Sequence, residues 1–161
     1  MEVKNILVPI DGSKHSDKAV KLAADLAAKY GAKLHLLQVL LHGRLPDDIR
    51  KLSDKPSKPE PGMAVGAGYV EPSEPPEVLE DIADKLLEKA EESAKAEGAT
   101  EIEKAKTGGI AAEEILENAD KANADLIVMG SRGLGGLKGL LAGSVSYKVQ
   151  NLAKCSVITV K

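Results

Sequence analysis

Aromatic side chains and excess positive charge are both scarce in this sequence. It contains no Trp, no Phe and only three Tyr, and its 22 Lys and Arg are outnumbered by 25 Asp and Glu, which leaves a net charge of -3. Nucleic-acid binding usually relies on a basic surface for the phosphates and, for single strands, on aromatic rings that stack on bases. We therefore expect no nucleic-acid partner.

Cysteine and long hydrophobic runs are also nearly absent. Cys155 is the single cysteine, so the chain cannot form an internal disulfide, which agrees with a reducing compartment. No apolar run approaches the roughly 18 residues of a membrane span, and the first ten residues lack the apolar core of a signal peptide. We expect a cytoplasmic protein with no membrane partner.

The composition that remains is typical of one globular domain. The chain has 161 residues, of which 43% are hydrophobic and 29% charged. A chain of this size can bury enough apolar surface to fold without a disulfide or a structural metal. We therefore treat residues 1–161 as a single domain.

Short apolar runs alternate with helical patterns along most of the chain. Ser13 or Ser16 is a candidate N-cap for the first helix, and Gly31 is its expected stop. Because parallel strands need a crossover, this alternation predicts an α/β fold with a parallel sheet. The expected strands are 6–10, 34–41, 101–106, 126–129 and 157–160, and the expected helices are about 19–30, 79–90, 115–122 and 144–153.

Residues 43–76 interrupt this alternation. They hold seven of the eight prolines and show no sustained hydrophobic period, so we expect an irregular insertion. Two interpretations stay open: a flexible surface loop with no chemistry, or a lid over a ligand.

A glycine-rich turn follows the expected strand 126–129. Six glycines fall within residues 130–143, and a helix is expected to begin near Ser144. Glycines tolerate positive φ and let backbone amides approach a ligand, while a helix N-terminus attracts anions. The pattern predicts a phosphate site to which Arg132 or Lys138 adds positive charge, although a structural loop without a ligand remains an alternative.

The glycine spacing excludes two common phosphate motifs. No lysine stands between a glycine and a Ser or Thr as a Walker-type loop requires, and Gly133, Gly135 and Gly139 give one residue too many for a dinucleotide fingerprint. The spacing that remains is G-x2-G-x9-G-S, running from Gly130 to Ser144.

This motif resembles the nucleotide-binding motif of the universal stress protein family, in its ATP-binding branch. The opening ILVPIDGS and the closing CSVITV resemble the same family, so the likeness covers the chain outside the insertion. It implies an α/β fold in which a doubly wound, five-stranded parallel sheet has the strand order 3-2-1-4-5 and helices on both faces. Asp11 and the glycine turn would then meet at one crevice, where the winding reverses.

The resemblance also implies a role for each residue of an adenine-nucleotide site. Asp11, beside Pro9 and Ile10, would contact the ribose or adenine, Val39 would bind adenine through its backbone, and Met129 would border the base. The phosphates would be held by Gly130, Gly133, Gly143, Ser144 and Val145. One departure lies nearby, because Ala111 stands where many members carry proline.

Several of these residues also have a purely structural interpretation. Asp11 can be a turn residue before the first helix, and Ser144 can be a helix cap. His15, His35 and His42 are isolated from other metal-ligating residues, so we interpret them as surface or packing residues and expect no metal site.

The favoured function is an ATP- or other adenine-nucleotide-binding sensor or switch, with no catalytic residue assigned. Phosphoryl transfer needs positioned metal ligands and a base, and around the turn the sequence offers only Asp11 as a carboxylate. One alternative is a slow Mg2+-dependent ATP hydrolase. Another is a dimeric interaction module that binds no nucleotide. The resemblance implies a homodimer through strand 157–160.

Overall fold

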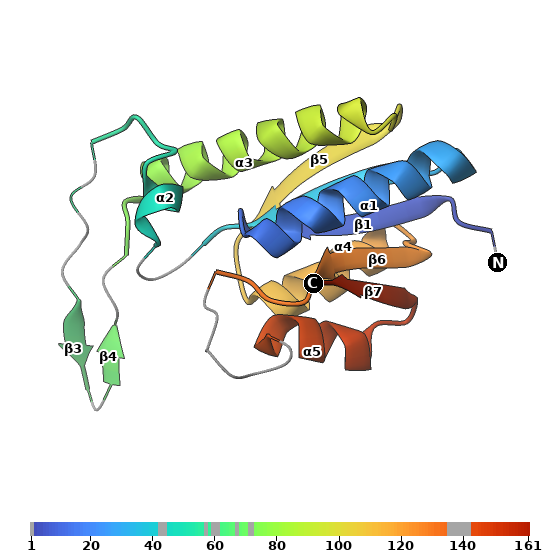
Figure 1. Cartoon of the computed structure of the whole chain (residues 1–161). Helices are drawn as coiled ribbons and strands as arrows, with labels where there is room; N and C mark the ends of the chain where they lie inside the picture. The colour runs from blue at the N-terminus through green and yellow to red at the C-terminus, as the bar shows by residue number, and fades with distance from the viewer. Residues whose placement is uncertain are drawn as a thin grey trace.

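A five-stranded parallel sheet forms the centre of the molecule (Figure 1). The computed structural model describes residues 2–41, 45–56, 58, 62–66, 68–70, 73–134 and 143–161. The sheet order is β5-β2-β1-β6-β7, so that, counted along the chain, the third, second, first, fourth and fifth strands are neighbours, as expected. The strands are β1 Asn5–Ile10, β2 Lys33–Val39, β5 Ile102–Thr107, β6 Leu126–Gly130 and β7 Ser156–Val160.

Four long helices pack against the sheet, and alternate residues of a strand face different helices. Ile6 and Val8 of β1 join a buried cluster with α1 and α3, whereas Leu7 joins a second cluster with α4 and α5. Burial on both faces explains why the central strands are continuous apolar runs rather than alternating ones. The helices are α1 Lys14–Tyr30, α3 Pro76–Ala96, α4 Ala111–Lys121 and α5 Ser144–Leu152.

The two ends of α1 follow from local chemistry. Of the two candidate caps, Ser13 is the N-cap, and its hydroxyl accepts a hydrogen bond from the backbone N–H of Ser16 at 3.1 Å. Gly31 ends the helix in the left-handed conformation with φ 65°, which glycine adopts without steric cost. These ends set where β1 and β2 join the helix.

The expectation that residues 43–76 are irregular throughout is wrong. A short helix, α2 Asp47–Arg50, lies within them, and β3 Met63–Val65 pairs antiparallel with β4 Gly68–Val70. Ile49 is only 4% exposed and joins the core cluster of α1 and α3. A four-residue helix is too short to produce a hydrophobic period. The hairpin lies away from the sheet (Figure 1).

No helix in the described part of the chain is long and apolar enough to cross a membrane.

Candidate functional site

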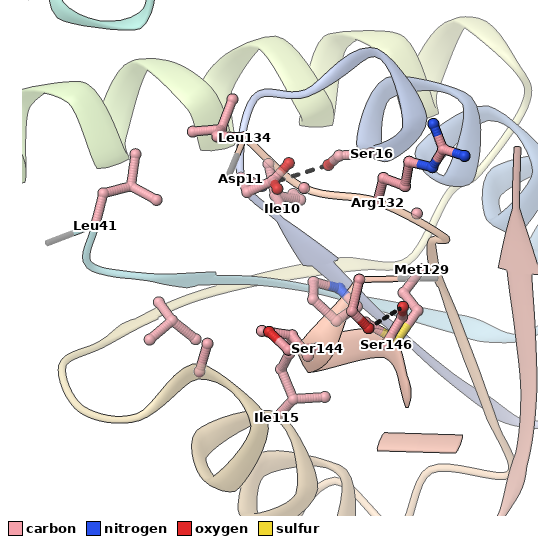
Figure 2. Close-up of a pocket in the computed structure, with 17 residues that line it drawn as sticks. Ile10, Asp11, Ser16, Leu41, Ile115, Met129, Arg132, Leu134, Ser144 and Ser146 are labelled. Atoms are coloured by element: carbon pink, nitrogen blue, oxygen red, sulfur yellow. Dashed lines mark hydrogen bonds between the residues drawn. The ribbon is translucent and has the colours of Figure 1, made fainter. Parts of the chain in front are cut away.

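The carboxyl ends of β1, β2 and β6 open into one pocket of about 370 Å³ (Figure 2). This volume lies in the range of small-molecule sites, roughly 300–1,000 Å³. β1 is also the strand at which the strand order reverses, because β2 pairs with it on one side and β6 on the other. Open α/β sheets bind ligands at such a point. Arg132 and every residue to which the family resemblance gives a role line this pocket: Pro9, Ile10, Asp11, Val39, Met129, Gly130, Arg132, Gly133, Gly143, Ser144 and Val145.

Asp11 combines a turn role with a position in the pocket. Its Oδ1 accepts a hydrogen bond from the N–H of Ser13 at 2.9 Å, which is the turn role that the sequence left open. Its other oxygen, Oδ2, faces Gly133 so closely that a Cβ on that glycine would lie 2.6 Å away. One carboxylate oxygen therefore holds the start of α1, and the other faces the glycine-rich turn.

Gly130 has no room for a side chain. A Cβ there would lie 2.8 Å from His15 Cβ and 3.0 Å from two backbone atoms, the carbonyl carbon of His15 and the nitrogen of Ser16. Of the two reasons expected for the glycines of the turn, positive φ does not apply to Gly130, Gly133 or Gly143. Among the described residues, the glycines with positive φ are Gly12, Gly31, Gly66, Gly98 and Gly109.

The first turn of α5 also lines the pocket, through residues 143–146. Gly143 is the N-cap, with no side-chain hydrogen bond, so the alternative role of Ser144 as the cap is wrong. The N–H of Gly143 donates to the carbonyl of Ser131 at 2.8 Å. The N–H groups that follow, beginning with Ser144 and Val145, have no partner within the helix and lie at its positive end. These groups suit an anion.

Apolar side chains form a separate wall of the same pocket. Val39, Leu41 and Ile115 lie on the side of β2 and α4, with Met129 from β6 and Leu134 from the turn. Figure 2 shows Leu41 and Ile115 on the rim away from Arg132. The pocket therefore offers apolar side chains to a flat ring and helix N–H groups to an anion within one ligand site.

Two charged side chains are found among the described residues that line the pocket, Asp11 and Arg132. Lys138, the other predicted cation, lies outside the described residues. No group of three His, Cys, Asp or Glu that could hold a metal occurs in the described ranges.

Some lining residues had no place in the predicted site. Ile115 was expected only as an apolar helix residue, and Leu41 as the end of a strand. Leu41 lies just beyond the carboxyl end of β2, which was the available signal for it, whereas Ile115 lies inside α4. The residues that the motif did not indicate are Ser16, Leu41, Ala111, Ile115, Leu134 and Ser146.

His15 and His35, the two histidines among the described residues, lie in different parts of the fold. His15 lies on α1, where Nδ1 is 3.2 Å from the hydroxyl of Ser131. His35 lies on β2, where Nε2 is 3.1 Å from Asn5 Oδ1, and burial lowers the pKa of its imidazole. His42 lies outside the described residues.

Sequence comparison defines the class of protein to which this fold and pocket belong. The model of the universal stress protein family matches residues 2–161, so the chain belongs to that family. Universal stress protein YxiE of Bacillus subtilis is 36% identical over 159 residues, which cover 97% of each chain.

Solved structures of the family share the fold. A crystal structure of a universal stress protein in complex with cAMP is 28% identical, with a TM-score of 0.64 and coverage of 100% of this chain and 98% of the other. The Archaeoglobus fulgidus universal stress protein in complex with dAMP is 23% identical, with a TM-score of 0.63 and full coverage of both chains. At that identity the second likeness supports the fold alone.

Proposed function

We propose that the pocket binds an adenine nucleotide and that the protein is a nucleotide-dependent sensor or switch of the ATP-binding branch. The base would lie on the apolar wall near Val39 and Met129, and the sugar near Asp11. The phosphates would lie against Gly133 and the first turn of α5. The observation that carries this proposal is one pocket that combines apolar side chains, one carboxylate among its described lining residues, and a helix N-terminus.

The chemistry of the lining residues supports this orientation. A carboxylate accepts hydrogen bonds from sugar hydroxyls and repels phosphates, so Asp11 suits the middle of the ligand. Free N–H groups and the helix dipole stabilise negative charge, so the α5 end suits the phosphates. Arg132 adds the positive charge of a side chain on the same pocket.

The relative solved with cAMP supports the class of ligand. Cyclic AMP and ATP share adenine, ribose and phosphate, and that relative covers the whole of this chain. We propose ATP, rather than cAMP, as the preferred nucleotide of this chain. If Mg2+ accompanies the nucleotide, phosphate oxygens and water would supply most of its ligands, because Asp11 is the only carboxylate among the described lining residues.

Isothermal titration with ATP, ADP, AMP and cAMP tests the proposal. We expect saturable 1:1 binding by the wild type and its loss in Gly133→Val, because the new side chain would collide with Asp11 Oδ2 and fill the crevice. Gly108→Val is the matched control, since a Cβ there meets only Leu40 Cδ1, at 3.9 Å. Absence of heat with all four nucleotides, or equal binding by Gly133→Val, would refute the proposed site.

A homodimer through β7 is a second part of the proposal. β7 is the last strand in the sheet order, with β6 as its described neighbour, and Ile158 on it is 37% exposed. Such an edge offers unpaired backbone groups to another strand. Sedimentation equilibrium at micromolar concentration should give a dimer mass, and Ile158→Lys should shift it toward monomer. A wild-type monomer throughout that range would rule the dimer out.

A further inference from the structure

We infer that His15, a residue outside the pocket lining, is a positioning residue for the phosphate end of the site and acts through Ser131. The inference rests on the proposed function, because it concerns how the nucleotide pocket is held in shape. Its basis is a set of contacts between α1, the glycine-rich turn, β7 and α5.

Ser131 joins four segments of the chain with its polar groups. It is only 3% exposed, and its N–H donates to the carbonyl of Val160 in β7 at 2.8 Å. Its carbonyl accepts from the N–H of Gly143 at 2.8 Å and from the hydroxyl of Ser146 at 3.0 Å. Its hydroxyl lies 3.2 Å from His15 Nδ1. Each of its polar groups therefore has a partner.

The carbonyl of Ser131 sets where α5 begins. It binds the N-cap residue Gly143 and also Ser146 in the first turn, and the Ser146 hydroxyl lies 3.0 Å from the Gly143 carbonyl as well. The N–H groups proposed to hold the phosphates belong to this same turn. A shift of Ser131 would therefore move these donors relative to the rest of the pocket.

His15 fixes the orientation of Ser131 from the α1 side. The His15 backbone and Cβ pack directly on Gly130, the residue before Ser131, where no side chain would fit. A second contact lies alongside, because the Ser13 hydroxyl donates to the carbonyl of Arg132 at 3.4 Å. The hydrogen bond between His15 and Ser131 involves neither Val39 nor Met129, the residues that border the proposed adenine position.

Because His15 acts on the phosphate end only, its removal should weaken the binding of ATP but not of adenosine. A general loss of structure would weaken both. ATP affinity is measured by calorimetry and adenosine affinity by NMR titration, which reads millimolar binding, for the wild type, His15→Ala, His15→Asn and Ser131→Ala. His15→Ala should weaken ATP binding about three- to tenfold, the value of one hydrogen bond, and leave adenosine affinity unchanged. His15→Asn should recover most of the loss, because its amide places a polar atom at the position of Nδ1.

Two further comparisons make the test specific. Ser131→Ala should match His15→Ala, and the double variant should lose no more than either single change, because both remove the same hydrogen bond. His35→Ala, which changes a histidine in a different part of the sheet, should bind ATP like the wild type. Thermal unfolding before titration confirms that each variant is folded.

The outcomes separate this inference from the proposed function. If wild-type protein binds neither ATP nor adenosine, the proposed function fails. If the wild type binds but His15→Ala binds ATP unchanged, or loses ATP and adenosine equally, the inference about His15 is wrong. An additive double variant would also overturn it, because Ser131 and His15 would then act independently.

Discussion

The Asp11 side chain has two roles, and each role alone would favour a different residue type at this position. The turn before α1 needs an oxygen acceptor for the N–H of Ser13, and Asn would supply it equally well. The negative charge on Oδ2, which faces Gly133, is needed only for a ligand with hydroxyl donors. The structural interpretation and the binding interpretation of Asp11 are therefore compatible, because each uses a different oxygen.

The glycine at position 130 should be required for stability. Gly130→Ala would place a methyl group 3.0 Å or less from His15 and Ser16, partly against backbone that cannot rotate away. We expect the free energy of unfolding to fall by about 1–3 kcal/mol, the usual cost of overpacking. Urea denaturation measures this. Gly108→Ala, directly after the end of β5, is the control and should stay within about 0.5 kcal/mol of the wild type, because a Cβ there meets only Leu40 Cδ1 at 3.9 Å. Equal losses in the two variants would contradict the packing argument.

The glycine motif and the family resemblance were sufficient to indicate most of the pocket lining, but not the contacts that hold it. The motif and the opening strand name residues by local pattern, and those residues lie together because parallel strands end at one edge of the sheet. The link between His15 and Ser131 joins positions 116 residues apart. No local pattern specifies such a pair, so it required the structure.

At the scale of elements, salt bridges attach the outer strand β5 to helix α3. β5 is mostly exposed, so apolar burial contributes little there. Lys106 bridges Glu80 and Asp84 at 2.7 Å each, and Glu91 pairs with Lys104 of β5 and, at 2.6 Å, with Lys95 of its own helix. The Glu and Lys of this helix, expected from the sequence to form a solvated face, thus include residues that hold the sheet edge.

These bridges predict a specific contribution to acid sensitivity. Hydrogen bonds from Lys104 and then Lys95 lower the pKa of Glu91 from 4.5 to about 2. Because the folded pKa is depressed, the stabilisation is present above pH 4.5 and is lost as pH falls toward 2. Glu91→Gln should therefore be less stable than the wild type near pH 7, and the difference should shrink as the pH falls through this window.

Urea denaturation at several pH values between 2 and 7 measures the effect. Glu92→Gln, an exposed neighbour on the same helix, is the control and should differ little from the wild type at any pH. A Glu91→Gln penalty that is constant across the range would mean that packing, and not the ionised carboxylate, carries the contribution.

The helix and strands within residues 43–76 could not be predicted from the sequence. The long helices and central strands were predictable because their apolar periods extend over many residues. In residues 43–76, Leu45 and Ile49 both join the buried core cluster, and Cδ1 of Ile49 would lie 2.8 Å from a Cβ on Gly12. Two apolar residues among prolines form no sustained period, so only their tertiary contacts reveal that this segment packs against the core.

At the scale of the whole molecule, nucleotide binding should stabilise the fold, because the pocket is assembled from distant parts of the chain. Its lining residues come from β1, β2, α4, β6, α5 and the turns after the strands, and they come together only in the folded sheet. A ligand that binds only the folded state at 100 times its dissociation constant adds about 2.7 kcal/mol. For a chain of this size, each kcal/mol raises the unfolding temperature by roughly 2–4 °C.

Saturating ATP should therefore raise the unfolding temperature of the wild type by roughly 5–10 °C. Differential scanning fluorimetry or calorimetry measures the shift, which should grow with the logarithm of ATP concentration. Gly133→Val should show no shift, and His15→Ala a smaller one at the same ATP concentration, because its dissociation constant is larger. An equal shift in the wild type and in Gly133→Val would place the stabilising ATP elsewhere on the protein, since that substitution alters the pocket at Asp11.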